Sequence, residues 1–168
     1  MKRKITATGV IFGIYCLILV WIVLCKTSFS VTEFKMLFGK RNINIIPFLY
    51  QDAVSFRFHI REVLLNVLVF IPFGVYLKMF GKPDGKTVLY GFAFSFALEL
   101  CQFILAVGVS DITDIITNTT GTAIGVCSYV LAGKIFADKA GTDRIINALA
   151  SAAILIFLTF IMLLVAAN

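Results

Sequence analysis

Five long runs of hydrophobic residues alternate with shorter polar stretches along this chain. Each run has about 20 residues, which is the length that an α-helix needs to cross the hydrocarbon core of a bilayer. The pattern therefore predicts an all-α, polytopic integral membrane protein with about five transmembrane helices. The expected helices cover residues 5–25, 62–80, 87–107, 111–135 and 146–166. Because no internal repeat is visible, residues 1–168 are predicted to form a single membrane domain.

Composition excludes a soluble globular domain. Of the 168 residues, 60% are hydrophobic and only 14% are charged, against roughly 25% charged residues in ordinary soluble domains. The formal net charge of +6 could indicate nucleic-acid binding, but the basic residues form short clusters beside the apolar runs. That distribution is typical of membrane topology signals, so no nucleic-acid partner is expected. The four cysteines lack the spacing of a zinc site or a disulfide framework, and the sequence identifies no cofactor.

The first apolar run follows the basic tetrapeptide MKRK and could belong to a signal peptide or to a membrane helix. It is longer than the usual apolar region of a signal peptide, and no small-x-small cleavage site follows it. We therefore expect residues 5–25 to be a transmembrane helix.

Lysine and arginine residues predict the orientation, because cytoplasmic loops of membrane proteins are enriched in them. Of the 15 in this chain, nine fall on the side of the N-terminus and six fall in the long first loop. The nine are Lys2, Arg3, Lys4, Lys78, Lys82, Lys86, Lys134, Lys139 and Arg144. Their side is the richer one for its loop length, which predicts a cytoplasmic N-terminus and a C-terminus outside the cell membrane.

The long segment 26–61 is too apolar for an ordinary solvent loop. Residues 31–38 carry a rough helical stripe of apolar positions that could lie in the membrane interface. Pro47 favours an extended conformation for the residue before it, so the next piece is expected to run as a loop against the membrane surface. Within the second run, Pro72 removes a backbone hydrogen bond and, with Gly74 nearby, predicts a kinked or widened helix.

Acids and amides interrupt sequence that is otherwise apolar enough for lipid. A membrane-embedded acid costs roughly 2.5 kcal/mol or more, so these residues indicate a functional site. In the expected topology they gather at the outer ends of the second, third and fourth runs, namely Glu62, Asn66, Glu99, Gln102, Asp111, Asp114 and Asn118. The first loop opens on the same side and would add Asn44, Pro47, Arg57, His59 and Arg61.

Five positions of the fourth run advance by three or four residues, which places them on one helical face. They are Asp111, Asp114, Asn118, Gly121 and Gly125. The two glycines form a GxxxG motif, which predicts the close approach of a second helix. Glu99 and Gln102 on the third run could face this seam across a short turn. We therefore expect the glycines to pack the hairpin that the third and fourth runs form.

Four sequence elements resemble those of the VanZ-like family of bacterial membrane proteins. They are NIIPF at 44–48, R-E-x-x-x-N at 61–66 continuing into FIPFG at 70–74, ELCQ at 99–102, and DITDIITNTTGTAIG at 111–125. The resemblance covers about 80 residues and implies a family core over about 42–136, flanked by the helices 5–25 and 146–166. Many family members carry an arginine just before the two aspartates, where this chain has Val109 and Ser110.

The resemblance implies a protein of the bacterial cell envelope. The family is named for an accessory protein of a glycopeptide-resistance cluster that lowers susceptibility to teicoplanin, a lipid-bearing glycopeptide antibiotic. Such a protein could act without catalysis, by binding or excluding a lipid-linked envelope molecule or the lipoglycopeptide at an outward-facing polar site. We expect the binding residues of this site to be Asn44, Arg61, Glu62, Asn66, Gln102 and Asn118.

Two other functions remain open. One is a membrane enzyme that acts on a lipid-linked phosphate or sugar, with Glu99, Asp111 and Asp114 as general acid, general base or divalent-metal ligands. The phosphate contacts of this enzyme would be Arg57, His59 or Arg61. The other is a transporter, which five helices without an internal repeat favour less.

A purely structural interpretation competes with all three functions. Asp111 and Asp114 could cap the start of the fourth run, because acids are favoured in the first turn of a helix. Glu99 could be neutralised by Arg61. Capping does not account for Glu99 or Asn118, which lie within apolar runs.

Overall fold

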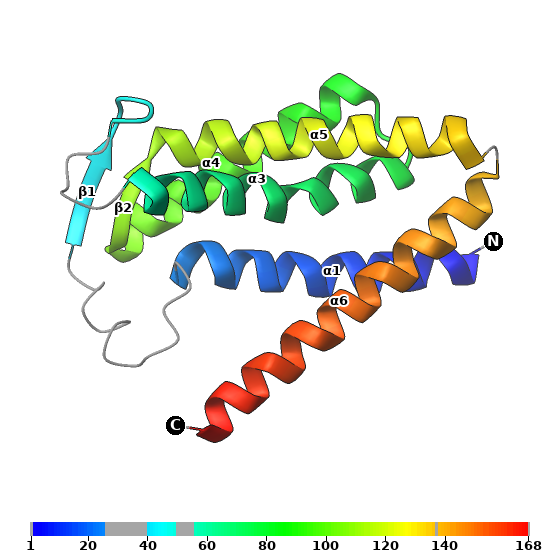
Figure 1. Cartoon of the computed structure of the whole chain (residues 1–168). Coiled ribbons are helices and arrows are strands. Elements are labelled where there is room, and N and C mark those ends of the chain that lie inside the picture. The colour runs from blue at the N-terminus through cyan, green and yellow to red at the C-terminus, as the bar shows by residue number, and fades with distance from the viewer. Residues whose placement is uncertain (1, 26–39, 50–55, 137, 168) are drawn as a thin grey trace.

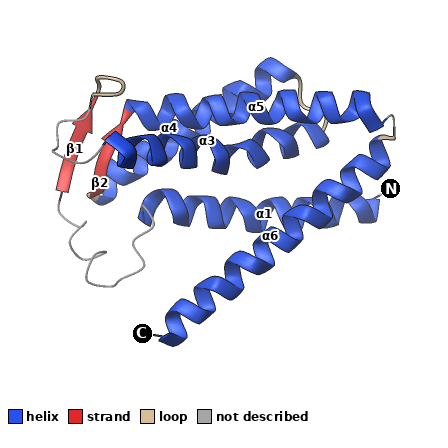
Figure 2. Cartoon of the chain, viewed as in Figure 1, coloured by secondary structure: helices blue, strands red, loops and turns tan. Residues whose placement is uncertain are grey.

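The computed structural model describes residues 2–25, 40–49, 56–136 and 138–167. Long helices dominate this part of the chain, and two short strands join them (Figures 1 and 2). The elements are α1 (Lys2–Cys25), β1 (Lys40–Asn44), α3 (Phe56–Met79), α4 (Asp84–Leu105), β2 (Val107–Asp111), α5 (Ile112–Phe136) and α6 (Lys139–Ala167). All five of these helices are long and apolar enough to cross a membrane, which confirms the predicted all-α, multi-pass architecture. The expected interfacial stripe at 31–38 lies outside the described residues.

The helices run back and forth between two ends of the bundle (Figure 1). We call one of them the strand end, because β1 and β2 lie there with the start of α3, the end of α4 and the start of α5. The opposite end holds the connections from α3 to α4 and from α5 to α6. We call it the lysine end, after Lys78, Lys82, Lys86, Lys134 and Lys139.

α3 begins earlier than the hydrophobic pattern predicts. It starts at Phe56 rather than at residue 62, so Arg57, His59 and Arg61 lie on the helix. The prediction that the first loop carries these three residues is therefore wrong. A helical turn at the membrane edge can carry polar side chains, because water solvates them there. A search for hydrophobic runs does not detect such a turn.

α6 also begins earlier than predicted, at Lys139 rather than at residue 146. The Asp138 carboxylate caps the helix, accepting hydrogen bonds from the backbone N–H groups of Ala140 and Gly141 at 2.9 and 3.0 Å. This cap satisfies donors that the first turn leaves without partners inside the helix. The charged connection predicted between the last two helices is consequently much shorter.

The two strands are absent from the sequence prediction, which places loops at both positions. β1 and β2 pair in parallel, with Lys40 opposite Val107 and Asn44 opposite Asp111. The pairing becomes possible because α4 stops at Ala106, whose left-handed backbone (φ 53°) ends the helix before the chain extends into β2. Backbone hydrogen bonds thus hold residues 40–44 against the turn between α4 and α5.

α3 and α5 make the most extensive helix contact of the described chain. Gly121 and Gly125 on α5 lie against the backbone carbonyls of Val67 and Ile71 on α3. A Cβ atom on either glycine would overlap those carbonyl oxygens. Small residues of this kind let membrane helices approach closely enough for their backbones to touch.

The prediction that these glycines pack α5 against α4 is wrong, because they face α3. Gly74 on α3 completes the contact from the other side, where a Cβ would overlap the carbonyl oxygen of Thr122. α4 meets α5 through Gly91, which leaves room for the side chain of Thr122. The close contact between α4 and α5 therefore depends on Gly91 of α4 and not on the glycines of the GxxxG motif.

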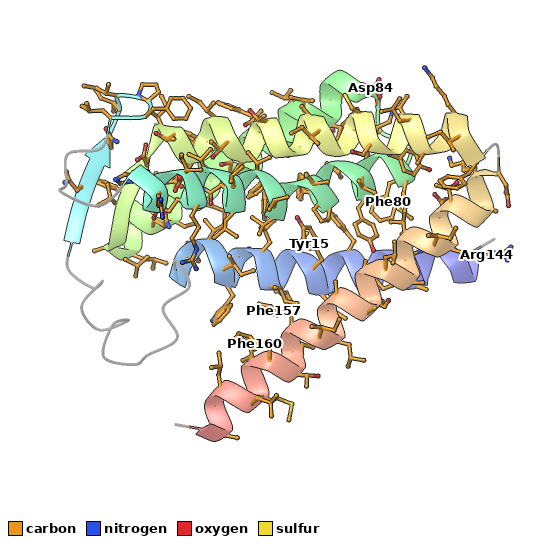
Figure 3. All side chains as sticks on the ribbon, viewed as in Figure 1. Tyr15, Phe80, Asp84, Arg144, Phe157 and Phe160 are labelled. Carbon is orange, nitrogen blue, oxygen red and sulfur yellow. The ribbon has the colours of Figure 1, made fainter. Side chains whose placement is uncertain are left out.

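Pro72 lies inside α3, which continues through it to Met79. Proline has no N–H to donate to the carbonyl four residues earlier. Close to this gap, the hydroxyl of Tyr15 on α1 donates to the carbonyl oxygen of Val69 at 2.5 Å. Figure 3 shows Tyr15 between α1 and α3. The hydroxyl of Tyr15 thus joins α1 to α3 one residue beyond the carbonyl of Leu68, which Pro72 leaves without its helical donor.

Candidate functional site

Glu99 ties the end of α4 to the start of α5 at the strand end. Its side chain is buried, and its Oε2 accepts a hydrogen bond from the backbone N–H of Asp111 at 2.9 Å. The hydroxyl of Ser110 donates to the backbone carbonyl of Glu99 at 2.9 Å. Both contacts join α4 to β2 across the turn. The expected ion pair of Glu99 with Arg61 is not present among the described residues, and Arg61 is exposed on α3.

Asp111 caps α5, as the structural interpretation predicts. Its Oδ1 accepts a hydrogen bond from the backbone N–H of Thr113 at 2.7 Å. Its Oδ2 accepts a hydrogen bond from Asn44 Nδ2 at 3.1 Å. Both carboxylate oxygens therefore hold groups of the protein itself, one in the backbone of α5 and one in the first loop.

Asn44 organises the loop that follows β1. Its Oδ1 accepts a hydrogen bond from the backbone N–H of Ile46 at 3.2 Å, and its Nδ2 donates to the carbonyl of Leu49 at 3.1 Å. Pro47 and Phe48 occupy the middle of the turn that the Leu49 N–H closes onto the carbonyl of Ile46. The turn is therefore tied at both ends to one side chain.

Phe48 has a positive φ of 57°, a conformation that costs free energy for any residue except glycine. Its backbone N–H donates to Thr113 Oγ1 at 3.0 Å, which attaches the loop to the first turn of α5. Together with the bond from Asn44 to Asp111, this contact holds the strained conformation in place.

Asp114 belongs to a second group of polar residues, located between α3 and α5. Its Oδ1 accepts a hydrogen bond from Asn66 Nδ2 on α3 at 2.7 Å. One turn away on α3, Glu62 lies 3.7 Å from the imidazole of His59. The sequence places Glu62 and Asn66 on one helical face, and in the structure both reach the pocket described next.

This pocket measures ≈ 180 Å³ and opens beside α1, α3 and α5. Its described walls are the apolar residues Ile22, Val23, Leu65 and Val69 together with the polar residues Glu62, Asn66 and Asp114. Two carboxylates and an amide thus face an otherwise apolar hollow inside a membrane protein. Pockets that bind small molecules commonly combine mostly apolar walls with a few placed polar groups.

Gln102 and Asn118 make hydrogen bonds between helices and are not among the described residues that line this pocket. Gln102 is fully buried, and its Nε2 donates to the backbone carbonyl of Val23 on α1 at 2.8 Å. Asn118 is 1% exposed, and its Nδ2 donates to Ser95 Oγ on α4 at 2.9 Å. Interhelical hydrogen bonds of this kind stabilise helix association in membranes.

Within the described residues, no group of three histidine, cysteine, aspartate or glutamate side chains is arranged to hold a metal ion. Glu99 and Asp111 meet through a backbone N–H, whereas Asp114 turns to Asn66 and the pocket. The predicted polar layer is thus two neighbouring groups with different partners.

Several contributing residues escape sequence reasoning. The hydroxyl of Thr113 accepts the hydrogen bond from the backbone of Phe48 that holds the first loop. Its position within the DITD element is the one local signal that could have indicated this role. Ile22 and Val23 form a wall of the pocket but look like any other residues of an apolar run. Their role depends on α1 lying beside α3.

Comparisons with known proteins agree with the resemblance in the motifs. A family model described as VanZ/LLP1 matches residues 12–133, from within α1 to within α5. Protein VanZ of Enterococcus faecium is 34% identical over 145 residues, which cover 85% of this chain and 84% of that protein. No solved structure matches the chain. The matched region includes the pocket, the two polar groups and the glycine contact, and the chain belongs to the VanZ/LLP1 family.

Proposed function

We propose that this protein lowers the sensitivity of a bacterium to a lipid-bearing glycopeptide antibiotic. It does so without catalysis, by binding an amphiphilic envelope ligand or the lipoglycopeptide at the strand end. The observation that carries the proposal is the pocket beside α1, α3 and α5, in which apolar walls meet Glu62, Asn66 and Asp114. The relationship to Protein VanZ of Enterococcus faecium supports it.

The chemistry of the pocket selects the class of ligand. Carboxylates such as Glu62 and Asp114 accept hydrogen bonds and attract protonated amines, and they repel phosphate groups. The walls from Ile22, Val23, Leu65 and Val69 suit an acyl chain. A lipoglycopeptide carries both features, because its peptide N–H groups and sugar hydroxyls are donors and its lipid is apolar.

The proposed orientation places the strand end outside the cell. The lysine end carries Lys82 in the connection from α3 to α4, and Lys134 and Lys139 flank the connection from α5 to α6, which is an enrichment typical of the cytoplasmic side. Ile43, Ile45 and Phe48 are exposed at the strand end, where they would contact the outer face of the bilayer. A ligand in the outer leaflet would then reach the pocket directly from lipid.

The alternative enzyme is less well supported by the geometry. Both oxygens of Asp111 and one oxygen of Glu99 bind backbone or loop groups. Only Asp114 of the three candidate acids is among the described pocket residues. General acid–base catalysis needs a carboxyl group within reach of the substrate, and one such acid beside Glu62 is a sparse set for phosphoryl or glycosyl transfer.

An expression test addresses the function and the site together. The gene would be expressed in a susceptible bacterium, and the lowest inhibitory concentration of teicoplanin would be measured. We expect the wild-type protein to raise that concentration and Asp114→Asn to lose most of the gain, because the amide keeps the contact to Asn66 but removes a charge from the pocket.

The matched control is Asp84→Asn at the lysine end, which makes the same chemical change on an exposed residue. Equal protection by both variants, at equal abundance in the membrane, would disprove the role of the pocket. Absence of any protection by the wild type would disprove the function. Formation of product when the purified protein meets lipid-linked precursors, with or without a divalent metal, would favour the enzyme instead.

The orientation has a separate test. In a variant whose native cysteines are replaced, Ile45→Cys at the strand end and Lys134→Cys at the lysine end would be labelled by a membrane-impermeant maleimide on intact cells. Both positions are exposed. We expect labelling at residue 45 only, and labelling at residue 134 only would place the pocket on the cytoplasmic side.

A further inference from the structure

A second cleft lies at the lysine end, between α3, α5 and the first turn of α6. Its volume is ≈ 420 Å³, and its polar lining comes from Lys78, Tyr129, Lys139 and Thr142. Thr142 is 5% exposed and the Lys78 side chain is 16% exposed, so both form its inner wall. Lys139, the first residue of α6, is exposed. The cleft thus has two lysines in its lining, of which Lys78 is paired with Asp84 and Lys139 is exposed at the edge of the membrane-spanning region.

The charge around this cleft is positive. Residues 78–86 and 134–144 contain six basic and three acidic side chains, an excess of three positive charges. Arg144 and Asp84 are labelled at this end of the bundle in Figure 3. The strand-end pocket is the reverse case, because carboxylates line it. The linings of the strand-end pocket and of this cleft are therefore suited to groups of opposite charge.

Each acid at the lysine end already has a partner within the protein. Asp84 pairs with Lys78, Asp138 caps α6, and Asp143 accepts a hydrogen bond from the hydroxyl of Tyr129 at 2.9 Å. Lys139 makes no ion pair with any described residue. Asp138 and Asp143, the acids nearest to it in sequence, have other partners, so the ammonium group of Lys139 is open to a ligand at the mouth of the cleft.

The surroundings of the cleft indicate a lipid rather than a soluble anion. Beyond Thr142, no residue of α6 up to residue 166 is buried. Large apolar side chains such as Leu149, Leu155 and Ile156 are more than half exposed along this helix. Acyl chains attached to a headgroup in the cleft would lie against that surface, whereas free phosphate gains nothing from it.

We propose that the cleft at the lysine end binds the phosphate headgroup of an anionic phospholipid. The ammonium group of Lys139 contacts the phosphate, Lys78 forms the inner wall while paired with Asp84, and the acyl chains lie along α6. Basic pockets between transmembrane helices are suited to lipid headgroups, and each lysine near an anionic membrane surface contributes about a fivefold gain in binding. The site is separate from the strand-end pocket and does not depend on the function proposed for it.

Native mass spectrometry of the purified full chain in detergent tests this site. The probes are phosphatidylglycerol, phosphatidylcholine of the same acyl chains, and inorganic phosphate as a competitor. We expect the wild type to retain phosphatidylglycerol in preference to phosphatidylcholine. Lys139→Gln should weaken phosphatidylglycerol retention about fivefold, and Lys139→Arg, which keeps the charge, should restore it.

The matched control is Lys86→Gln, which removes one exposed lysine from the same end but not from the cleft lining. Equal losses for Lys139→Gln and Lys86→Gln would overturn the site and leave a diffuse charge effect. Equal retention of the two phospholipids by the wild type would overturn the headgroup specificity. Displacement of phosphatidylglycerol by millimolar inorganic phosphate would overturn the lipid as the source of the phosphate.

Discussion

α5 and α6 are consecutive long helices of the same chain, and they meet their surroundings in opposite ways. The most apolar 18-residue stretch of α5 has a mean hydropathy of 1.3, whereas that of α6 has a mean hydropathy of 2.8. The less apolar helix is the buried one. α5 packs against α3 and α4 in the centre of the bundle, whereas α6 crosses α1 at a steep angle in Figure 1 and is largely exposed from residue 143 onward.

The buried residues of α5 explain the difference. They are Thr113, Thr117, Asn118, Gly121, Thr122, Gly125 and Val126, of which only the last is a large apolar residue. Lipid is as apolar as leucine, so hydrophobicity does not drive one membrane helix against another. Close packing and hydrogen bonds between helices decide instead which helix is buried in the bundle. In this protein, high hydropathy therefore marks exposure to lipid and not membership of the core.

The largest expected effect comes from filling the contact between α3 and α5. Gly125→Val should destabilise the folded protein by about 3 kcal/mol, because the new side chain meets the backbone of α3, which cannot move aside. Unfolding of the purified protein, followed by circular dichroism in increasing denaturing detergent, would measure the loss. Gly133→Val is the control, since that glycine on the same helix has open space around it.

Removing the cap of the packed helix α5 should cost more stability than removing the cap of the exposed helix α6. Asp111→Ala is expected to cost about 2 kcal/mol, at the upper end for a lost cap, because Asp111 also holds Asn44. Asp138→Ala at the start of α6 should cost about 1 kcal/mol, since its described partners are local. The same unfolding measurement compares them. A larger loss for Asp138→Ala would show that α6 contributes more to stability than its packing indicates.

The hydrogen bond between Asn118 and Ser95 should make a smaller contribution. A double-mutant cycle with Asn118→Ala and Ser95→Ala is expected to give a coupling of about 0.6 kcal/mol, the usual size for interhelical bonds in membranes. The single variants should each cost more than the coupling, because both side chains are buried. Additive effects of the two substitutions would indicate that this bond does not stabilise the contact between α4 and α5.

The smallest effect is expected on α6. Leu155→Ala should change the free energy of unfolding by no more than about 0.5 kcal/mol, as is usual for exposed positions, because Leu155 is 66% exposed. Leu98→Ala on α4 removes the same atoms from a side chain that is 4% exposed and should cost about 2 kcal/mol. Similar values for the two variants would contradict the contrast between the packed helices and α6.

Local sequence was sufficient for the number and approximate position of the membrane spans. A run of about 20 apolar residues is a helix in lipid, because every backbone polar group must be satisfied within the segment. The motifs also indicate the correct family, whereas the single polar layer that the sequence predicts is two neighbouring groups in the structure. The starts of α3 and α6 were placed too late, since their first turns are polar.

Tertiary contacts alone decided what each of those polar residues does. Asn44 reaches Asp111 across 67 positions of sequence, and Asn66 reaches Asp114 across 48. Those bonds attach Asp111 to the first loop and Asp114 to α3, although both acids lie on one predicted helical face, whereas the bond by which Asp111 caps α5 is local. The glycines likewise meet α3 rather than α4. A periodic pattern indicates which residues share one face of a helix. It does not indicate which helix packs against that face, because this depends on how segments distant in sequence come together.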